Sequence, residues 1–416
     1  MSATTLERPA AVRSGSRPSP TAEPVRHRTL VPVSGILDRH EDHGFLRLDG
    51  YLPGPRDLYV PASLIRQHGL RTGDLVHGAA EPQSAESEYS AQSTQSAKPA
   101  RPSKARPLAR IDTVNGRPPG ALAGRAQFSA MTPLHPQERL RLETGPGQVG
   151  TRIIDLLAPI GKGQRGLIVA PPKTGKTMLL QAIAAAVGRN HPEAHLMVVL
   201  LDERPEEVTD MRRSVAAEVV ASTFDRPAHE HIKIAELAVE RAKRLAEQGQ
   251  DVVILLDSLT RLCRAHNNNA KSGGRTLSGG VDAAAVAAPK QLFGAARNLQ
   301  EGGSVTILAT ALVDTGSRAD DYYFEELKST GNMELRLDRS LAERRIFPAI
   351  DVAASGTRRE ELLVPAAELD AIWRLRRVLR GQSNQQAVEL LVERTKHTAG
   401  NSEFLQQIMR TTPAGS

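Results

Sequence analysis

The sequence contains almost no cysteine and no long hydrophobic run. Cys263 is the single cysteine among 416 residues, so no internal disulfide can form and an oxidising compartment would not stabilise the fold. Residues 1–28 lack an apolar core of signal-peptide length, and no later apolar run is long enough to span a membrane. We therefore expect a soluble, cytoplasmic protein that does not contact a membrane.

The charge balance alone does not identify a partner. Lysine and arginine total 54 against 47 aspartate and glutamate, and the sequence pI is near 9.7. A polyanionic partner and an ordinary solvated basic surface fit this balance equally well. The hydrophobic content of 40% is sufficient for at least one sizeable core, and the length is sufficient for two or three domains.

Changes in composition divide the chain into five parts. The first residues are rich in Pro, Ser and Arg, whereas short apolar runs between Gly, Pro and Asp over 30–78 favour a small β-barrel or sheet. A stretch rich in Ser, Gln and Pro then interrupts this pattern. We predict a disordered basic tail over 1–29, a β-rich domain over 30–115 with a flexible insert over 79–106, a connector over 116–150, an α/β domain over 151–365 and a helical region over 366–416.

Four continuous apolar runs and one amphipathic stripe predict the α/β domain. The runs have the pattern of strands that are buried on both faces of a parallel sheet. They begin at Gly166, Leu196, Val252 and Val305. Between the second and third runs, apolar side chains from Ala235 to Ala246 recur at helical spacing. Near the C-terminus we predict two helices, the first with Ser383 as its N-cap and the second with Asn401 or Ser402.

The stretch Ala-Pro-Pro-Lys-Thr-Gly-Lys-Thr, which ends at Thr177, lies between a predicted buried strand and a run compatible with a helix. This is the setting of a Walker A loop, although Ala170 stands where the usual motif begins with Gly. Gly175 permits close approach of the backbone to phosphate, Lys176 reaches the β- and γ-phosphates, and Thr177 offers its hydroxyl to Mg²⁺. The sequence therefore predicts ATP and Mg²⁺ as ligands.

Two further predicted strands end in acidic residues. Asp257 follows the run that begins at Val252, where a Walker B carboxylate would orient Mg²⁺. Asp202 and Glu203 end another run, and Glu203 is placed to activate the attacking water. A structural salt bridge with Arg204 is the alternative role for this pair. Because three strand ends, including the Walker A loop, converge at one edge of the sheet, we favour a catalytic site.

Long consecutive motifs in this chain closely resemble the Rho transcription termination factors. These motifs are Thr151–Gly166, Asp202–Met211, Leu277–Ala283 and Ser355–Leu363. The resemblance covers most of residues 145–363 and, more weakly, 33–78. It implies a hexameric ring of RecA-like P-loop ATPase domains, each with an N-terminal OB-fold-like barrel and a C-terminal helical subdomain. Such a ring hydrolyses ATP at subunit interfaces and pulls RNA through its centre.

The resemblance also implies roles for residues of the nucleotide site. Glu203 is the catalytic base, and Thr177 and Asp257 hold Mg²⁺. Phe347 stacks on adenine. Arg358 resembles an arginine finger that reaches into the neighbouring subunit's site, with Arg345 assisting. The remaining nucleotide contacts are Lys173, Thr174, Gly175, Lys176 and Met178.

Two pore loops are implied in the same way. The first contains Gly279, Gly280 and Arg275, the last at a position where the family usually has Lys. The second contains Lys328, followed by Ser329 in place of the usual Gly. Positive charge survives both changes, so we expect both loops to hold the RNA backbone. Composition alone would indicate only solvated, Gly-rich loops.

The barrel resembles the primary RNA-binding site of the family. Phe45, Arg47, Asp57 and Tyr59 are retained, and the resemblance implies that they stack on bases and bond to them. His43 stands where the family has a second Phe, the usual aromatic near residues 106–109 is missing, and the preceding helical bundle is not apparent. An ordinary barrel core is the alternative role for the two retained aromatic residues.

The predicted function is therefore that of an ATP-dependent RNA translocase and helicase that terminates transcription. One version of this prediction is that the chain is a divergent second copy of the family in its organism. The implied partners are nascent RNA, identical subunits in a homohexamer, RNA polymerase and elongation factors. Two alternatives remain open. One is another RecA-like ring ATPase, and the other is an RNA-binding ring that has lost hydrolysis.

Overall fold

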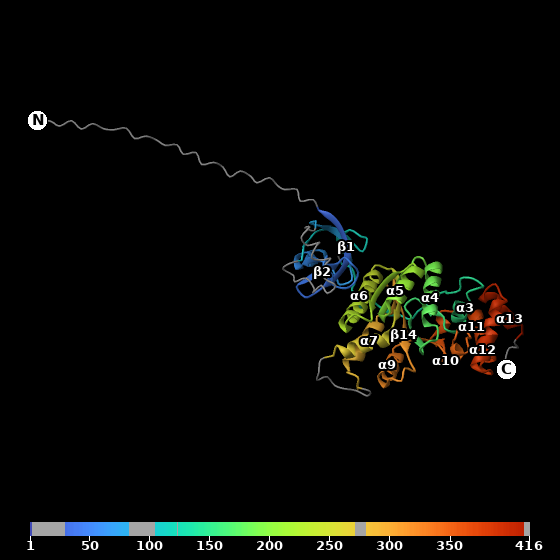
Figure 1. The fold of residues 1–416 in the computed structure, drawn as a ribbon. Coiled ribbons are helices and arrows are strands. Elements are labelled where there is room, and N and C mark those ends of the chain that lie inside the picture. Colours follow the sequence, from blue (N-terminus) through green and yellow to red (C-terminus); the bar gives the residue numbers. More distant parts are fainter. Residues whose placement is uncertain (2–29, 83–104, 123, 271–279, 412–416) are drawn as a thin grey trace.

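The computed structural model describes Met1 and residues 30–82, 105–122, 124–270 and 280–411. A β-rich domain, a central α/β domain and a helical C-terminal end follow one another along the molecule in chain order (Figure 1). The tail predicted over 1–29 and most of the insert predicted over 79–106 lie outside the described residues. No described helix is both long and apolar enough to cross a membrane.

The N-terminal domain is a five-stranded antiparallel sheet in the order β3-β2-β1-β4-β5. An isolated bridge between Tyr59 and Pro107 joins its two edges, so the sheet closes into a barrel. Alternate side chains point inward and form its core, among them the fully buried Leu37, Leu46 and Leu58. The elements are β1 (Val31–Arg39), β2 (His43–Arg47), β3 (Leu58–Pro61), α1 (Ala62–His68), β4 (Leu75–Ala80) and β5 (Leu108–Val114).

The central domain is built on a sheet whose main path runs β11-β10-β12-β14-β9-β15-β16. Neighbouring strands along this path are parallel except for β16, which is antiparallel to β15. The four strands predicted from apolar runs are confirmed. The strands of this path are β9 (Arg165–Ala170), β10 (His195–Glu203), β11 (Glu218–Thr223), β12 (Asp251–Asp257), β14 (Ser304–Leu312), β15 (Met333–Arg336) and β16 (Gly356–Thr357).

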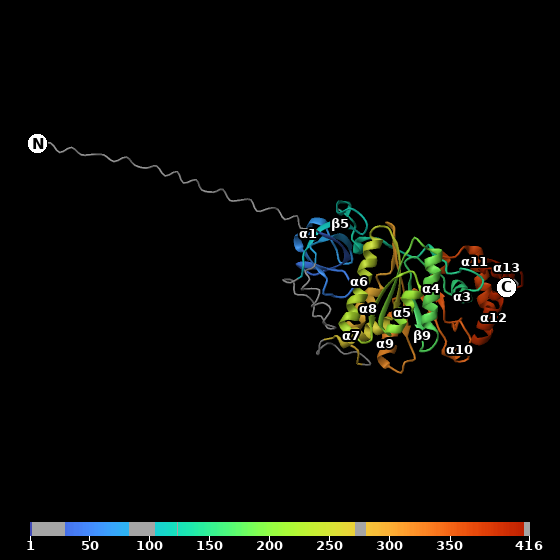
Figure 2. The ribbon, with the colours of Figure 1, turned by 45° about the horizontal axis from the view of Figure 1, so that its top comes forward.

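Helices cover both faces of this sheet, and alternation along each strand assigns side chains to one face or the other. Met197, Val199 and Leu201 of β10 pack in the core that includes α6, whereas Leu196 and Val198 pack in the core that includes α4. In Figure 2, α6 lies toward the barrel and α4 toward the C-terminal helices. The covering helices are α3 (Val149–Leu157), α4 (Lys176–Asn190), α5 (Pro205–Ser214), α6 (Ala228–Ala246), α7 (Leu259–Asn268), α8 (Ala284–Phe293) and α9 (Arg318–Lys328).

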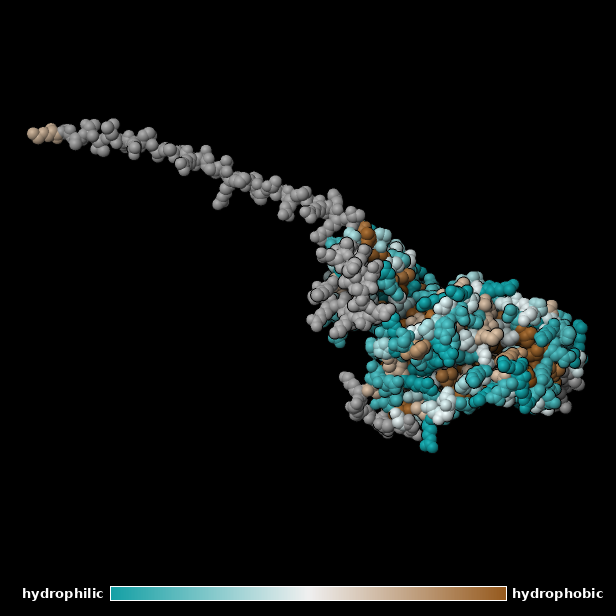
Figure 3. Space-filling view, viewed as in Figure 1, coloured by the Kyte–Doolittle hydropathy of each residue, from teal (hydrophilic) through white to brown (hydrophobic). Residues whose placement is uncertain are grey.

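The C-terminal end consists of three helices packed against α3. Ser383 caps α12 through a capping box with Gln386, as the sequence predicted. The prediction of Asn401 or Ser402 as the next cap is wrong, because α13 begins at Asn401, whose side chain bonds instead to Arg152. Apolar residues are visible on the surface of this end (Figure 3). Val378 and Met409 of these helices are partly exposed. These helices are α11 (Ala366–Arg380), α12 (Asn384–Lys396) and α13 (Asn401–Thr411).

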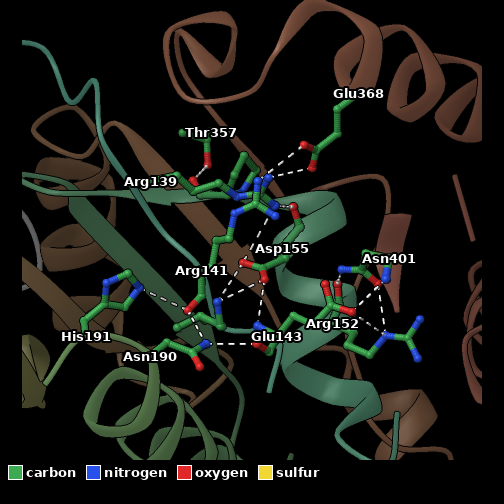
Figure 4. Close-up of polar contacts among 12 residues, drawn as sticks. Arg139, Arg141, Glu143, Arg152, Asp155, Asn190, His191, Thr357, Glu368 and Asn401 are labelled. Atoms are coloured by element: carbon green, nitrogen blue, oxygen red, sulfur yellow. Dashed lines mark hydrogen bonds and ion pairs between the residues drawn. The ribbon is translucent and has the colours of Figure 1, made fainter. Parts of the chain in front are cut away.

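A short segment of the connector is joined to the central domain by polar contacts (Figure 4). The buried Asp155 carboxylate of α3 accepts the backbone N–H groups of Leu142, at 3.0 Å, and Glu143, at 2.8 Å. The Asn190 amide, at the end of α4, donates to the carbonyls of Arg141 and Glu143. The remaining short elements are η1 (Pro119–Leu122), η2 (Phe128–Ala130), β6 (Pro133–Leu134), β7 (Arg139–Leu140), β8 (Ile160–Gly161), β13 (Arg297–Leu299), α10 (Arg339–Glu343) and η4 (Glu360–Leu362).

Candidate functional site

The Walker A loop joins the end of β9 to the start of α4. Gly175 adopts a left-handed conformation with φ of 84°, and a Cβ at this position would come within 3.3 Å of the Phe347 ring. Glycine is therefore needed both for the turn and for the approach of the ring. Thr174 is buried and its hydroxyl donates to the Pro171 carbonyl at 2.8 Å, which fixes the loop. The helix that starts at Lys176 directs its free N–H groups toward this loop, as an anion site requires.

The outer wall of this loop is exposed and apolar. Met178 and Phe347 are 75% and 48% exposed, which is unusual for large apolar side chains. Lys173 has a positive φ of 66°, so its backbone belongs to the same tight loop. The predicted role of these three residues in binding the nucleotide stays a prediction.

The Walker B carboxylate lies beside the Walker A lysine. Asp257, only 2% exposed at the end of β12, accepts a hydrogen bond from Lys176 Nζ at 2.6 Å and another from Thr310 Oγ1 at 2.8 Å. Thr310 lies on the adjacent strand β14 and was not predicted from the sequence. Two strands and the loop therefore place a carboxylate and an ammonium group at the same edge of the sheet, as predicted.

Glu203 reaches this edge from β10. Asp202 has a positive φ of 56°, and the register with β11 shifts between Leu201 and Glu203, so the end of the strand departs from regular pairing. Burial raises the pKa of Glu203 to about 7, reinforced by Glu207 and Asp257 and opposed by Lys176 and Arg261. A carboxyl group with a pKa near 7 is suited to accept a proton at neutral pH.

Arg261 is the main partner of Glu203, and the sequence did not reveal it. Its guanidinium donates to the Glu203 carboxylate and to the Asp202 carbonyl. Arg204, the partner considered in the alternative reading, instead lies 4.0 Å from Glu207. Arg261 lies on α7, four residues after Asp257, and it meets Glu203 of β10 through tertiary packing, so no local pattern in the sequence identifies this pair.

The residues at this edge fit Mg²⁺ bound together with phosphate. Among the described residues, no group of three or more His, Cys, Asp or Glu side chains is arranged to hold a metal ion by itself. Magnesium in nucleotide sites takes one or two protein oxygens and completes its shell with phosphate oxygens and water. Thr177 and Asp257 supply such oxygens, and the Thr177 hydroxyl lies 3.4 Å from Glu207 Oε2.

Arg358 lies away from the Walker A loop of its own chain. It follows β16, and its backbone N–H donates to the Asn332 carbonyl at 2.9 Å, next to the first residue of β15. Because β15 is parallel to β9, Arg358 lies at the amino edge of the sheet while the Walker A loop follows the carboxyl edge. Arg345, by contrast, lies two residues before Phe347 and shares its loop. The roles of both arginines stay predictions.

Lys328 ends α9 and lines, together with Arg358 and Arg376, a cavity of about 290 Å³. Its Nζ lies 5.6 Å from the centre of the Phe324 ring. Gly280 has a positive φ of 76°, a conformation that favours glycine. The other two residues predicted for the first pore loop, Arg275 and Gly279, lie outside the described residues.

Aromatic rings gather on β2 and β3 of the barrel. The His43 ring stacks on Tyr59 with centroids 5.7 Å apart, and Phe45 meets His43 edge to face at 5.3 Å. His40, which the sequence analysis did not select, stacks on His43 at 5.2 Å. Phe45 is only 8% exposed, whereas His43 and Tyr59 are half-buried. The stacked rings of His40, His43 and Tyr59 therefore form one continuous surface, which we call the ring face of the barrel.

The two charged residues predicted to bond bases are buried in an ion pair with each other. Arg47 is 6% and Asp57 4% exposed, and Arg47 Nη1 donates to Asp57 at 2.6 Å. Asp57 also accepts the Gly54 N–H at 2.8 Å. The Arg47 guanidinium carbon also lies 5.3 Å from the centre of the Phe45 ring. The predicted contact of Arg47 and Asp57 with bases stays a prediction.

Two family models match the chain. Residues 150–357 match the nucleotide-binding domain of the ATP synthase alpha/beta family, and residues 33–120 match the RNA-binding domain of the Rho termination factor. Together the two models cover both domains that carry the predicted sites.

Several curated relatives are transcription termination factors Rho. The chain is 60% identical to that of Streptomyces lividans over 92% of its own length and 52% of the relative's. It is 58% identical to that of Micrococcus luteus, covering 92% and 55% respectively. It is 59% identical to that of Streptomyces coelicolor, covering 94% and 89%. The chain thus spans about half the length of the first two relatives and most of the third.

Solved structures with a similar fold are ATPases of type III secretion systems. One, from pathogenic bacteria, has a TM-score of 0.54 at 25% identity and covers 63% of this chain and 83% of its own. Another, from enteropathogenic E. coli, has a TM-score of 0.57 at 22% identity and covers 75% and 79%. These likenesses concern the fold alone.

Proposed function

The chain belongs to the family of Rho transcription termination factors, and from that premise we propose that it is an RNA-stimulated ATPase that translocates along nascent RNA and terminates transcription. The observation that carries this proposal is the nucleotide site. Lys176, Asp257 and Glu203 come from three separate segments and meet at one edge of the sheet, with Glu203 held at a pKa near neutrality.

The catalytic steps follow from these positions. Lys176 neutralises charge on the β- and γ-phosphates, and its present bond to Asp257 holds it at the mouth of the loop. Glu203 accepts a proton from the attacking water, while Arg261 keeps the carboxylate oriented. Thr177 and Asp257 would hold Mg²⁺, which would supply further charge neutralisation for the transferred phosphoryl group.

The position of Arg358 supports action between subunits. In its own chain it lies at the opposite edge of the sheet from the Walker A loop, so it serves as an arginine finger only in a neighbouring site. A ring of identical subunits, proposed as a hexamer, provides such neighbours. Lys328, which shares a cavity with Arg358, then faces the RNA, and RNA binding and hydrolysis are linked through this one region.

The partners and setting follow from the family. We propose nascent RNA as the substrate that is moved, RNA polymerase and elongation factors as partners, and the cytoplasm as the location. The RNA-binding match over 33–120 favours this function over that of a rotary or secretion ATPase with a similar central domain. The acidic and basic residues of the nucleotide site favour it over a ring without hydrolysis.

ATP hydrolysis by the purified protein, measured with and without homopolymer RNAs, tests the proposal. We expect turnover to rise with RNA and to be lost in Lys176→Ala, because no other side chain of the loop replaces this point charge. Lys173→Ala is the matched control from the same loop and should retain more activity. Turnover that does not change with RNA would contradict the assignment. So would turnover by Lys176→Ala above roughly one tenth of that of the unmodified protein, with any of the RNAs.

A further inference from the structure

Four charged side chains, drawn from both domains, meet beneath the ring face of the barrel. Asp38, at the end of β1, is fully buried and accepts bonds from the Arg47 guanidinium, with Nε at 3.1 Å. Arg47 also donates to Asp57 at 2.6 Å. The fourth charge belongs to the ATPase domain, because Lys233 of α6 places Nζ 2.6 Å from Asp38 Oδ1. We call these four residues the interdomain ion cluster.

The barrel's share of this cluster is not neutral. Asp38 and Asp57 carry two negative charges against the single positive charge of Arg47, and Lys233 brings the sum to zero. Burial raises the pKa of Asp38, but hydrogen bonds from Lys233 and Arg47 outweigh this effect and leave the pKa below its usual value. Asp38 is therefore ionised at neutral pH, and removal of Lys233 would leave a buried carboxylate short of one cation.

The cluster lies directly behind the rings proposed to stack on bases. The Arg47 guanidinium carbon is 5.3 Å from the centre of the Phe45 ring. His40 Nε2 is 3.8 Å from Asp38 Oδ2, and the same ring stacks on His43. A net negative charge at this depth would act on any phosphate that approaches the face.

Other charged groups border the cluster from α6 and β1. Glu236, one turn after Lys233, has a pKa raised by burial and further by Asp38 and Glu240, while Lys233 lowers it. Arg39 lines the same cleft of about 330 Å³ between the barrel and α6. Glu236 and Arg39 offset one another when both are charged, and Glu240 and Lys243 of the same cleft form an ion pair with each other. The contact of Lys233 with Asp38 therefore decides the sign of the net charge.

We propose that Lys233, a residue of the ATPase domain, completes the primary RNA site of the barrel by neutralising the carboxylates behind it. This inference rests on the proposed RNA-binding function of the barrel. RNA affinity depends strongly on the electrostatics of the phosphates. RNA therefore binds better when the net charge of the interdomain ion cluster is zero than when it is negative. By thermodynamic reciprocity, RNA on the barrel strengthens the contact between Asp38 and Lys233, which joins the two domains.

The two domains are held together at other points, so a change at Lys233 leaves them docked. The Tyr51 hydroxyl donates to Glu218 Oε1 at 2.6 Å, and Arg241 Nη1 donates to the buried Asn115 at 2.5 Å. Gly73, with φ of 87°, packs so closely on α6 that a Cβ there would lie 2.5 Å from the backbone nitrogen of Arg241. A loss of RNA affinity in a Lys233 variant therefore reports charge rather than separation of the domains.

Binding of a short oligocytidylate to the full chain tests the inference. An oligonucleotide of roughly six residues matches one barrel, and fluorescence anisotropy at low ionic strength gives its Kd. We expect Lys233→Met to raise Kd roughly two- to fivefold, the effect of one charge placed on the order of 10 Å from phosphate in a solvent-rich setting. Adding Asp38→Asn to the same chain should restore the original Kd, because the charge sum returns to zero.

Lys243→Met is the matched control. Lys243 lies on the same helix, and its Nζ pairs with Glu240 at 2.6 Å, so its removal should leave Kd unchanged. Equal Kd values for the unmodified chain and Lys233→Met would overturn the inference, as would a double variant that binds as weakly as Lys233→Met while unfolding at the unmodified temperature. Absence of binding by the unmodified chain would overturn the proposed function of the barrel and this inference with it.

Discussion

At the scale of single residues, the protonation of Glu203 sets the pH range of the proposed hydrolysis. Its pKa of about 7 means that the carboxylate is the minor form below neutral pH. We expect kcat/KM for ATP to fall as pH decreases through about 7, because only the ionised carboxylate accepts the proton of water. Since Arg261 lowers the pKa of Glu203, Arg261→Gln should move this acid limb to higher pH.

A pH series of initial rates for both proteins measures the shift. Arg264→Gln is the control, because Arg264 lies one turn further along α7 and pairs with Asp320 rather than with Glu203. An acid limb at the same pH in all three proteins would show that Glu203 does not titrate in this step. A limb displaced equally in both variants would point to a general effect of lost charge.

At the scale of secondary-structure elements, Asp155 fixes the connector to α3 and thereby to the ATPase domain. Asp155→Ala leaves the N–H groups of Leu142 and Glu143 without their acceptor, and we expect a loss of about 1–3 kcal/mol in the free energy of unfolding. Urea unfolding measures it, with Asp370→Ala, from the exposed side of α11, as the control. A loss no larger than that of the control would contradict this role.

The same carboxyl group gives this junction a pH dependence. Burial raises the pKa of Asp155 from 3.8 to about 6, against the opposing effect of Arg139. The folded state therefore binds this proton more tightly than the unfolded state. The stabilisation that comes from binding this proton is fully present below pH 3.8 and is lost as pH rises through about 6. Asp155→Asn should remove this part of the pH profile.

Element patterns in the sequence predict the centre of the fold better than its edges. The apolar runs of β9, β10, β12 and β14 are detectable because both faces of these strands are buried. By contrast β11 is a half-buried edge strand and β15 is only four residues long, so neither forms a continuous run. The sequence thus predicts a parallel sheet but not its borders.

The candidate site likewise contains residues that the sequence predicts and residues that it does not. Lys176, Thr177 and Asp257 follow directly from a loop motif and a strand end. Arg261 reaches Glu203 only because α7 packs under β10, and Lys233 reaches Asp38 only because the barrel docks on α6. Such partners are set by tertiary contacts between distant segments, which local patterns do not encode.

At the scale of the whole molecule, the separation of Arg358 from its own Walker A loop supports the proposal that activity depends on the assembly. In the proposed ring, each Arg358→Ala subunit would inactivate the site of its neighbour, while its own site would receive Arg358 from the next subunit. We therefore expect turnover in mixed rings to fall more steeply than in proportion to the mole fraction of the variant. If the sites hydrolyse ATP in sequence, one inactive interface stops the whole ring. ATPase assays across mixing ratios, after dissociation and reassembly, measure this curve.

Arg359→Ala is the matched control, because Arg359 is the next residue and pairs with exposed Glu361 on the surface. Its mixing curve should therefore stay flat. A straight line for Arg358→Ala would exclude sequential coupling of the sites. Full activity from a monomer identified by light scattering would exclude catalysis between subunits.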